Sequence, residues 1–289
     1  MDIALETEDG ARLAARLFSP ADGAAPKGAV LIVPAMGVVQ GFYERFARWL
    51  ASEQFLVMTF DFRGVGASKT TPLRSVRADI VTWAQHDAKT ALADLVERAG
   101  GAPVTWIGHS LGGQIVPFVP NRREVAKVIT VATGSGYWRE NAPALRRKVW
   151  LFWWGAVPIA TPRFGYFPGR RLGMVGDLPR GVIAQWRRWC LDREYAVGAE
   201  GPEVRKLFAD VLTPVTAFSF SDDEMMSAAN IESIHGFYTS APKKMRRLVP
   251  SELGVRRVGH FGFFRPEMEY PLWRAHLVPE LARTAVAAS

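Results

Sequence analysis

Three short, unbroken apolar runs constrain the fold of this chain more than any other feature. They are AVLIV at Ala29–Val33, FLVMTF at Phe55–Phe60 and VTWI at Val104–Ile107. Runs that are apolar on both faces are typical of strands in a parallel sheet covered by helices on each side. The stretches between them, Phe42–Ser52 and Val76–Arg98, have helical periodicity. The order strand, helix, strand, helix therefore predicts an α/β fold with right-handed crossovers.

Three further segments extend the predicted sheet. Ile3–Phe18 alternates in polarity around Asp9-Gly10, which predicts an antiparallel hairpin ahead of the parallel strands. The apolar runs Ala126–Ala132 and Pro214–Phe220 predict two later strands. We therefore expect one central sheet, mostly parallel and flanked by helices.

Composition and apolar patterning predict a globular protein without a membrane span. The 289 residues are 48% hydrophobic, which is enough to bury a large core. The acidic N-terminus is not followed by an apolar run of signal-peptide length. The most apolar window, Val149–Ala160, is shorter than the roughly 20 residues that a spanning helix needs. Because Cys190 is the only cysteine, no internal disulfide can form, and we expect a cytoplasmic location.

The net charge of +8 raises the question of a polyanionic partner. The basic residues are scattered as pairs, such as Arg122-Arg123 and Arg256-Arg257, and make no polybasic run. We interpret them as a solvated surface and expect no nucleic-acid partner. The chain also has no C-x-x-C pair, no H-E-x-x-H and no phosphate-binding glycine loop, so we expect no metal and no organic cofactor.

A possible nucleophile follows the third apolar run directly. Gly108-His-Ser-Leu-Gly112 has the pattern G-x-S-x-G, between a predicted strand and residues expected to be helical. A nucleophile on a sharp strand-to-helix turn needs small neighbours, and Gly108 and Gly112 meet that need. The following helix would direct its N–H groups and positive dipole end at developing negative charge. Ser110 is therefore the candidate nucleophile, with a helix N-cap role as the alternative.

With this motif the chain resembles the α/β-hydrolase superfamily over nearly its whole length. Residues 61–68, DFRGVGAS, resemble the D-x-R-G-x-G-x-S turn that follows an early strand in these enzymes. We interpret Asp61 and Arg63 within it as structural. The family has a His-Gly pair after a central strand, where this chain has Pro34 and Ala35 instead.

The resemblance also implies an oxyanion hole made of two backbone N–H groups. One belongs to the residue after the nucleophile, which is Leu111 here. The other comes from the loop after the first apolar run. By position it is the N–H of Met36, with Gly37 as the alternative.

A serine hydroxyl needs a base to take its proton, and the base needs an orienting acid. In this fold the chain order is Ser, acid, His. His260, in VGHFGFF, resembles the Gly-His of the family's last catalytic loop and is the predicted base. The other four histidines are adjacent to the serine or lie in expected helices: His86, His109, His235 and His276.

Three consecutive acidic residues follow the predicted strand Pro214–Phe220. The family places its acid a few residues beyond this strand, which favours Asp223. Asp222 is the main alternative and Glu224 a weaker one. We expect the aspartate that is not used to be a helix cap or a solvated charge. The 37 residues from Asp223 to His260 have room for one helix and one strand.

The chain between the sixth predicted strand and the acid differs most from a minimal hydrolase. We divide the chain into a core first part at 1–134, a helical cap insertion at 135–208 and a core second part at 209–289. The cap is rich in tryptophan. We expect its tryptophans to pack the cap onto the core, to line a pocket for an acyl or aromatic group, or to form an oligomer contact: Trp138, Trp150, Trp153 and Trp154. Residues 177–190 resemble a segment of a poorly characterised subgroup of capped hydrolases.

These observations predict a serine hydrolase, carboxylesterase-like and of class EC 3.1.1, that acts on a small-molecule acyl substrate. Ser110, His260 and Asp223 would cleave an ester-type carbonyl through an acyl-enzyme. An acyltransferase that uses the same triad is the alternative, because a cap that excludes water favours transfer. A non-catalytic binding protein on the same fold is a weaker one. The sequence leaves a homo-oligomer open.

Overall fold

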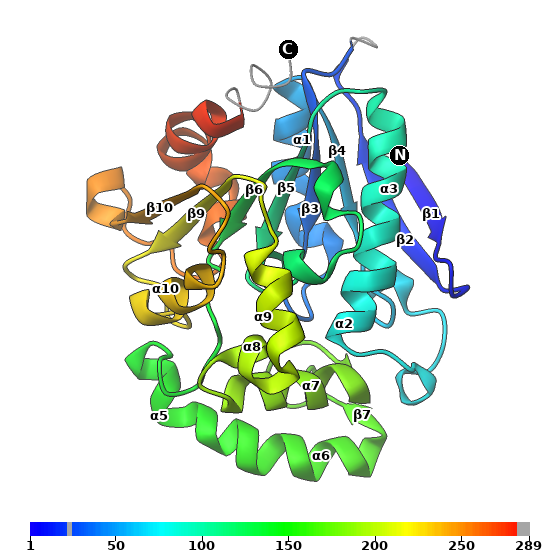
Figure 1. Ribbon diagram of the computed structural model, residues 1–289, viewed down its shortest axis with the longest axis vertical. Coiled ribbons are helices and arrows are strands. Elements are labelled where there is room, and N and C mark those ends of the chain that lie inside the picture. The colour runs from blue at the N-terminus through cyan, green and yellow to red at the C-terminus, as the bar shows by residue number, and fades with distance from the viewer. Residues whose placement is uncertain (22–24, 282–289) are drawn as a thin grey trace.

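The computed structural model describes residues 1–21 and 25–281, which form a central sheet with helices on both faces (Figure 1). Eight strands pair in the spatial order β1-β2-β4-β3-β5-β6-β9-β10. β1 and β2 are antiparallel, and the six strands from β4 onward in that order are parallel. The strands are β1 Asp2–Glu6, β2 Arg12–Phe18, β3 Gly28–Val33, β4 Phe55–Phe60, β5 Val104–His109, β6 Val125–Val131, β9 Val215–Phe220 and β10 Lys243–Leu248.

The unbroken apolar runs become the most deeply buried strands. Every residue of β3, β4, β5 and β9 is buried, as strands covered on both faces require. β5 continues two residues beyond the predicted run, because Gly108 and His109 pair with Thr130 and Val131 of β6. β10, with the sequence KKMRRL, alternates exposed and half-buried positions at the edge of the sheet. A charged edge strand of this kind contains no apolar run from which it could be predicted.

Helices cover both faces of the sheet and one end of it (Figure 1). Two π-helical segments, Trp83–Ala88 and Phe152–Ala156, join α2 to α3 and α5 to α6, and a third covers Glu269–Leu277. The helices are α1 Glu44–Ser52, α2 Ile80–Thr82, α3 Lys89–Ala99, α4 Leu111–Gln114, α5 Pro143–Leu151, α6 Val157–Phe164, α7 Arg180–Leu191, α8 Tyr195–Glu200, α9 Pro202–Ala209 and α10 Ala228–Gly236.

The helix predicted at Val76–Arg98 begins later, at Ile80. Asp79 has an extended backbone and its carboxylate accepts a hydrogen bond from the Thr82 N–H at 2.8 Å. The Thr82 hydroxyl lies 3.3 Å from the Asp79 N–H in return. This reciprocal capping box fixes the first turn, so the four residues before Ile80 remain outside the helix.

Two hydrophobic clusters fill the space on either side of the sheet. α1 and the C-terminal helix contribute Phe46, Trp49 and Trp273 to one cluster. α3 contributes Leu92 and Leu95 to the other, which continues without a break into the helices beyond the sheet.

We refer to residues 135–208 as the cap; its boundaries remain a prediction. It contains α5 to α9 and a two-stranded sheet of Tyr166–Phe167 (β7) and Leu178–Pro179 (β8), and lies at the lower end of Figure 1. Gln185 of α7 anchors it, because its side-chain carbonyl accepts hydrogen bonds from the N–H groups of Ile80 and Val81 at 2.7 and 3.1 Å. Among the described residues, no helix is both long and apolar enough to cross a membrane.

Candidate active site

Ser110 occupies a strained turn between β5 and α4. Its backbone has φ 49° and ψ −110°, a left-handed conformation that is costly for a residue with a side chain. The flanking glycines allow it. A Cβ on Gly108 would lie 2.4 Å from the Gly113 nitrogen, and one on Gly112 would lie 2.1 Å from the Val33 oxygen. Only glycine fits both positions, as the G-x-S-x-G pattern predicts.

His260 and Asp223 meet behind the serine. His260 Nδ1 lies 2.9 Å from Asp223 Oδ2 and 3.1 Å from Oδ1, and both side chains are almost fully buried. Because a carboxylate only accepts, Nδ1 carries the proton, which leaves Nε2 of the neutral ring as an acceptor. Asp223 Oδ1 also accepts hydrogen bonds from the N–H groups of Met225 and Met226, at 2.8 and 2.9 Å. The carboxylate is therefore fixed from two sides.

The two neighbouring acidic residues hold the backbone of the histidine loop. Asp222 accepts hydrogen bonds from the N–H groups of Val258, at 2.9 Å, and Gly259, at 3.1 Å. Glu224 accepts one from the His260 N–H at 3.1 Å. Asp222 is thus neither the helix cap nor the solvated charge that the sequence predicted. A residue whose partners are 36 and 37 positions away gives no local sequence signal.

A buried chain of hydrogen bonds connects three loops of the site. The Ala35 N–H donates to the Tyr43 hydroxyl at 3.0 Å, and that hydroxyl lies 2.8 Å from His109 Nδ1. His109 Nε2 lies 3.0 Å from the His260 carbonyl oxygen. Since a carbonyl only accepts, Nε2 carries the proton of His109 and Tyr43 donates to Nδ1. Burial lowers the pKa of His109 well below its usual value, with the nearby His260 acting in the same direction, so the ring is neutral.

Sequence reasoning missed Tyr43 and assigned His109 no role. The position of His109 beside the nucleophile was a signal that it lies close to the site. For Tyr43 no signal exists in the sequence, because its partners come from other elements of the fold.

Ser110 and His260 line one cavity of about 410 Å³, together with Met36, Gly37 and Leu111. Within the described part of the chain, the Ser110 hydroxyl makes no hydrogen bond, and neither do the backbone N–H groups of Met36 and Leu111. Hydrogen bonds between nucleophile and base are often long before substrate binds. The structure therefore brings four of the five predicted side chains and N–H groups to one cavity, with Asp223 behind it.

A second cavity of about 470 Å³ adjoins the first and is lined by residues of the cap together with Met225 and Met226. The two share five lining residues: Met174, Val175, Trp186, Met225 and Met226. The second cavity is lined almost entirely by apolar side chains, and these include Phe152 and Trp153. Across residues 1–21 and 25–281, no three His, Cys, Asp or Glu side chains are grouped so as to hold a metal ion.

The cap tryptophans divide into different environments. Trp153 is buried and lines the apolar cavity, and Trp138 is half-buried. Trp150 and Trp154 remain 49% and 48% exposed. Trp150 and Trp154 therefore line neither cavity, and an oligomer contact through them stays a prediction.

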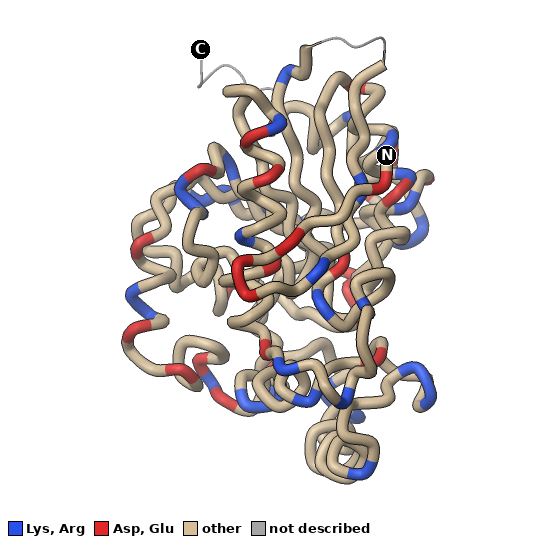
Figure 2. The backbone as a smooth tube through the Cα atoms, turned by 90° about the vertical axis from the view of Figure 1, so that its right-hand side faces the viewer, with Lys and Arg blue, Asp and Glu red and all other residues tan. Residues whose placement is uncertain are grey.

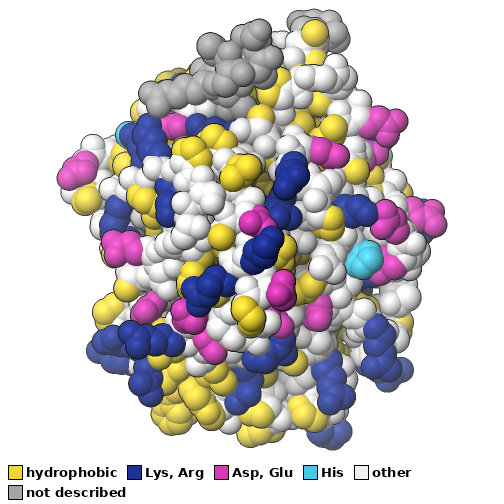
Figure 3. Space-filling view, viewed as in Figure 1, with side chains coloured by type: hydrophobic (Ala, Val, Ile, Leu, Met, Phe, Trp, Pro, Cys, Tyr) yellow, Lys and Arg dark blue, Asp and Glu magenta, His cyan; other side chains and the backbone are white. Residues whose placement is uncertain are grey.

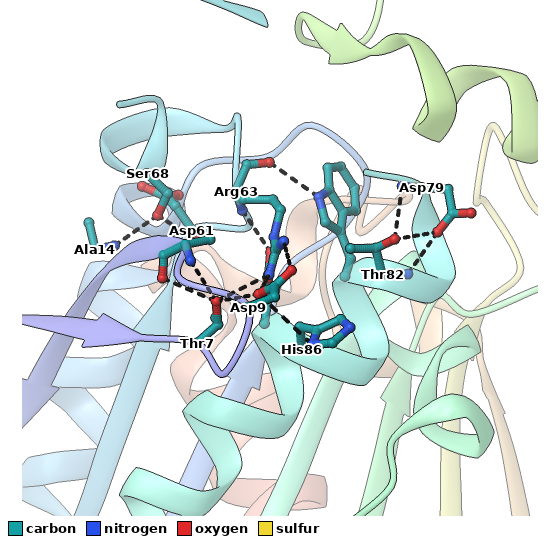
Figure 4. Close-up of polar contacts among 12 residues, drawn as sticks. Thr7, Asp9, Ala14, Asp61, Arg63, Ser68, Asp79, Thr82 and His86 are labelled. Atoms are coloured by element: carbon teal, nitrogen blue, oxygen red, sulfur yellow. Dashed lines mark hydrogen bonds and ion pairs between the residues drawn. The ribbon is translucent and has the colours of Figure 1, made fainter. Parts of the chain in front are cut away.

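The turn that contains Asp61 and Arg63 lies outside both cavities (Figure 4). Asp61 accepts hydrogen bonds from the N–H groups of Gln40 and Ala67 at 2.7 and 2.9 Å. Arg63 bridges Asp9 and Asp87, with Nε 2.7 Å from Asp87 Oδ1. Burial raises the pKa of Asp87 to about 6, while Arg63 acts to lower it. These contacts join the turn of the first hairpin to the π-helical segment Trp83–Ala88, which agrees with a structural role.

Comparisons with known proteins find similar chains among lipases and esterases. Residues 24–161 match the family model described as serine aminopeptidase, S33. Among solved structures, a monoglyceride lipase from Saccharomyces cerevisiae is 19% identical, with 85% of each chain covered and a TM-score of 0.61. A putative aryl esterase from Burkholderia cenocepacia is 13% identical, with 99% of this chain and 100% of that chain covered and a TM-score of 0.62.

The esterase domain of a Rhodothermus marinus protein is also similar, at 18% identity, with 98% of this chain and 97% of that chain covered and a TM-score of 0.59. No sequence relative among curated proteins matches the chain. The sheet order and these matches show the α/β-hydrolase fold, so the predicted fold class is confirmed.

Proposed function

We propose that this protein hydrolyses an ester-type carbonyl through a triad of Ser110, His260 and Asp223. The observation that carries the proposal is the buried pair of His260 Nδ1 and Asp223 beside a serine held at positive φ. The paired carboxylate keeps the imidazole in the tautomer whose Nε2 can accept a proton. A buried structural histidine would not need to share a cavity with a strained serine.

The proposed reaction has two halves. Ser110 Oγ attacks the carbonyl carbon while His260 Nε2 takes the hydroxyl proton, and Asp223 stabilises the imidazolium that forms. His260 then gives this proton to the leaving alcohol oxygen as the C–O bond breaks. In the second half water attacks the acyl-enzyme, His260 takes its proton and returns it to Ser110 Oγ, and the acid is released.

The backbone N–H groups of Met36 and Leu111 are the proposed oxyanion hole. Both residues line the cavity beside Ser110, and neither N–H makes a hydrogen bond to a described residue. Leu111 is the first residue of α4, where N–H groups of a helix have no partner within the helix. The Tyr43 hydroxyl accepts from the Ala35 N–H and so supports the loop immediately before Met36.

The adjoining apolar cavity is the proposed site of the acyl group. Its lining of Phe152, Trp153, Met225 and similar side chains favours a hydrocarbon chain over a polar group. Neither cavity has a described Asp or Glu in its lining that could bind the ammonium group of a peptide. This lining supports an ester over an N-terminal peptide bond, because a buried ammonium requires an anionic partner.

Hydrolysis of p-nitrophenyl esters from acetyl to decanoyl tests the proposal. We expect activity to fall roughly 10⁴-fold or more in Ser110→Ala and by a similar factor in Asp223→Asn. Asp222→Asn should lose much less, about tenfold, because Asp222 holds only the backbone of the loop. Adding an alcohol acceptor and measuring the ester product separates hydrolysis from acyl transfer.

The controls concern folding and the choice of acid. Each variant should keep the circular dichroism and thermal midpoint of the wild type, apart from a modest loss in the two aspartate variants. Equal rates in the wild type and Ser110→Ala on every ester would contradict the proposal. A greater loss in Asp222→Asn than in Asp223→Asn would assign the acid to Asp222.

A further inference from the structure

The net positive charge of this protein is confined to one part of the chain. Residues 135–191 contain ten Lys and Arg against two Asp and Glu, a net charge of +8. The rest of the chain has 26 of each sign and is neutral overall. In Figure 2 the lowest helix, which is the α5–α6 helix of the cap, carries Lys and Arg but no acidic residue. Three of the basic pairs lie in this part of the chain: Arg146-Arg147, Arg170-Arg171 and Arg187-Arg188.

Most of these cations are exposed and have no acidic partner. Within the part of the chain that the structure describes, eight exposed cations of residues 135–191 take part in no ion pair: Arg139, Arg146, Arg147, Lys148, Arg163, Arg170, Arg171 and Arg180. Elsewhere on the surface, cations such as Arg16 and Arg48 are paired with Glu44. Unpaired, clustered cations create a positive potential that attracts an anionic partner.

The same helix exposes large apolar side chains to solvent. Trp150, Leu151, Trp154 and Ile159 are 49%, 54%, 48% and 73% exposed. Trp150 and Trp154 are four residues apart on α5 and its π-helical continuation, so they lie on one face. Figure 3 shows hydrophobic side chains gathered at the lower end of the molecule, over this helix, with Lys and Arg on both sides. Exposed patches of this kind mark interaction sites.

We propose that this face of the cap binds an anionic lipid surface. We call it the outer face of the cap and define it as Arg146, Arg147, Trp150, Leu151, Trp154 and Ile159. A helix with Trp and aliphatic side chains beside Lys and Arg matches the interface of a bilayer, where apolar groups enter the acyl boundary and cations contact the headgroups. Tryptophan in particular favours this boundary.

The charge pattern argues against two other occupants. A second copy of the chain would place the same unpaired arginines against each other in a two-fold contact, which like-charge repulsion opposes. Single-stranded nucleic acid would use the tryptophans for stacking. It would leave the aliphatic Leu151 and Ile159 without partners, although Ile159 is the most exposed of the four.

The outer face is continuous with the apolar cavity lined by residues of the cap. Leu151 lies in both the outer face and the lining of the cavity, and Met174, which is 46% exposed, also lines the cavity. A lipid surface against the outer face would cover the mouth of this cavity. Surface binding does not rest on the proposed hydrolysis, because it needs neither Ser110 nor His260.

Vesicle flotation tests the proposal with the full chain. The probes are vesicles of phosphatidylcholine alone and vesicles of phosphatidylcholine and phosphatidylglycerol in equal parts. We expect binding to the anionic vesicles only, weakening as salt is added. Arg146→Glu with Arg147→Glu should weaken it by more than about a hundredfold, since each cation near an anionic surface contributes roughly fivefold. Trp150→Ser with Trp154→Ser should weaken it by about tenfold.

Matched controls come from exposed residues that do not belong to the outer face of the cap. Arg12→Glu with Arg247→Glu makes the same charge change, and Leu212→Ser removes an apolar side chain that is 66% exposed. We expect both to bind as the wild type does, and Ser110→Ala likewise. Equal binding to both vesicle types, or equal losses in cap and control variants, would overturn the proposal. So would tighter binding to a single-stranded oligonucleotide, or a dimer that forms through the tryptophans without vesicle binding.

Discussion

The carboxyl end of the sheet and the cap use their polar groups in opposite ways. At the sheet, Tyr43, His109 and Asp222 are buried or half-buried, and each makes hydrogen bonds that fix a loop of the site. In the cap, most surface cations of residues 135–191 take part in no ion pair, and the buried Thr161 hydroxyl has no hydrogen-bond partner within the described residues. The contrast indicates that hydrogen bonds at the sheet fix the loops of the candidate site, whereas the cap provides an apolar cavity and a surface.

Glycine substitutions should separate the two regions most strongly. In Gly112→Ala the new Cβ would lie 2.1 Å from the Val33 oxygen, so the turn at Ser110 must deform, and we expect a loss of about 4 kcal/mol or more of stability. Gly155 lies in the helical part of the cap with nothing within 4 Å of its Cβ position, and Gly155→Ala should gain roughly 0.5 to 1 kcal/mol. Urea unfolding measures both. Equal changes in the unfolding free energy of the two variants would contradict the expected difference between the sheet and the cap.

Low pH should destabilise the part of the protein outside the cap, because all five histidines lie there. Burial lowers the pKa of His235 to about 4, below the 6.5 expected in the unfolded chain. The folded state therefore resists protonation, so this contribution to stability is complete above pH 6.5 and is lost as the pH falls toward 4. The loss is about 3 kcal/mol.

His235→Gln tests this pH dependence. The side chain contacts the Ile231 carbonyl at 2.7 Å and the Thr130 hydroxyl at 2.9 Å, so the substitution also changes stability at neutral pH. The informative quantity is therefore the slope of the unfolding free energy between pH 7 and pH 4. We expect a shallower slope in the variant, and an unchanged slope would contradict the assignment to His235.

Removing one hydroxyl from the sheet region should lower the stability of the protein, whereas removing one from the cap should not. Tyr43→Phe leaves the buried His109 Nδ1 and the Ala35 N–H without their partner, and should cost about 2 kcal/mol in stability. It should also lower kcat for ester hydrolysis, because the chain of hydrogen bonds ends on the His260 carbonyl. Thr161→Val removes an unpartnered buried hydroxyl and should be neutral or stabilising. Thermal unfolding of the two variants decides the comparison.

The smallest expected effect concerns the apolar cavity. Ala156→Phe fills part of it and should lower kcat/KM for decanoyl esters by about tenfold while leaving acetyl esters unchanged. Ala144→Phe, at an exposed position of α5 outside the cavity lining, is the matched control. A uniform loss over all chain lengths in Ala156→Phe would indicate that the acyl group lies elsewhere.

Much of the sheet could be predicted from the sequence, because a strand that is buried on both faces is an uninterrupted run of apolar residues. The runs at Ala29–Val33 and Phe55–Phe60 are apolar without interruption, and both are strands. The hairpin at the start is confirmed, with Glu6 paired to Arg12. The strand β10 was not located, since an edge strand buries too little to need apolar residues.

The candidate site could be predicted only in part, for a related reason. The glycines around Ser110 act on backbone atoms a few residues away, so their pattern is visible in the chain. Asp222 and Asp223 are neighbours of the same residue type, and only the approach of the His260 loop distinguishes them.

The sequence by itself determined the α/β class and the glycine-flanked turn at Ser110, because each depends on burial periodicity or on short-range steric limits. The tertiary structure alone decided which loops Tyr43, Asp222 and Glu224 hold, since their partners are brought together by the sheet. It also decided that the basic residues of the cap share a surface with Trp150 and Trp154. Whether charged and exposed apolar side chains lie on the same surface depends on the folded structure. The linear sequence does not show which side chains face the same way.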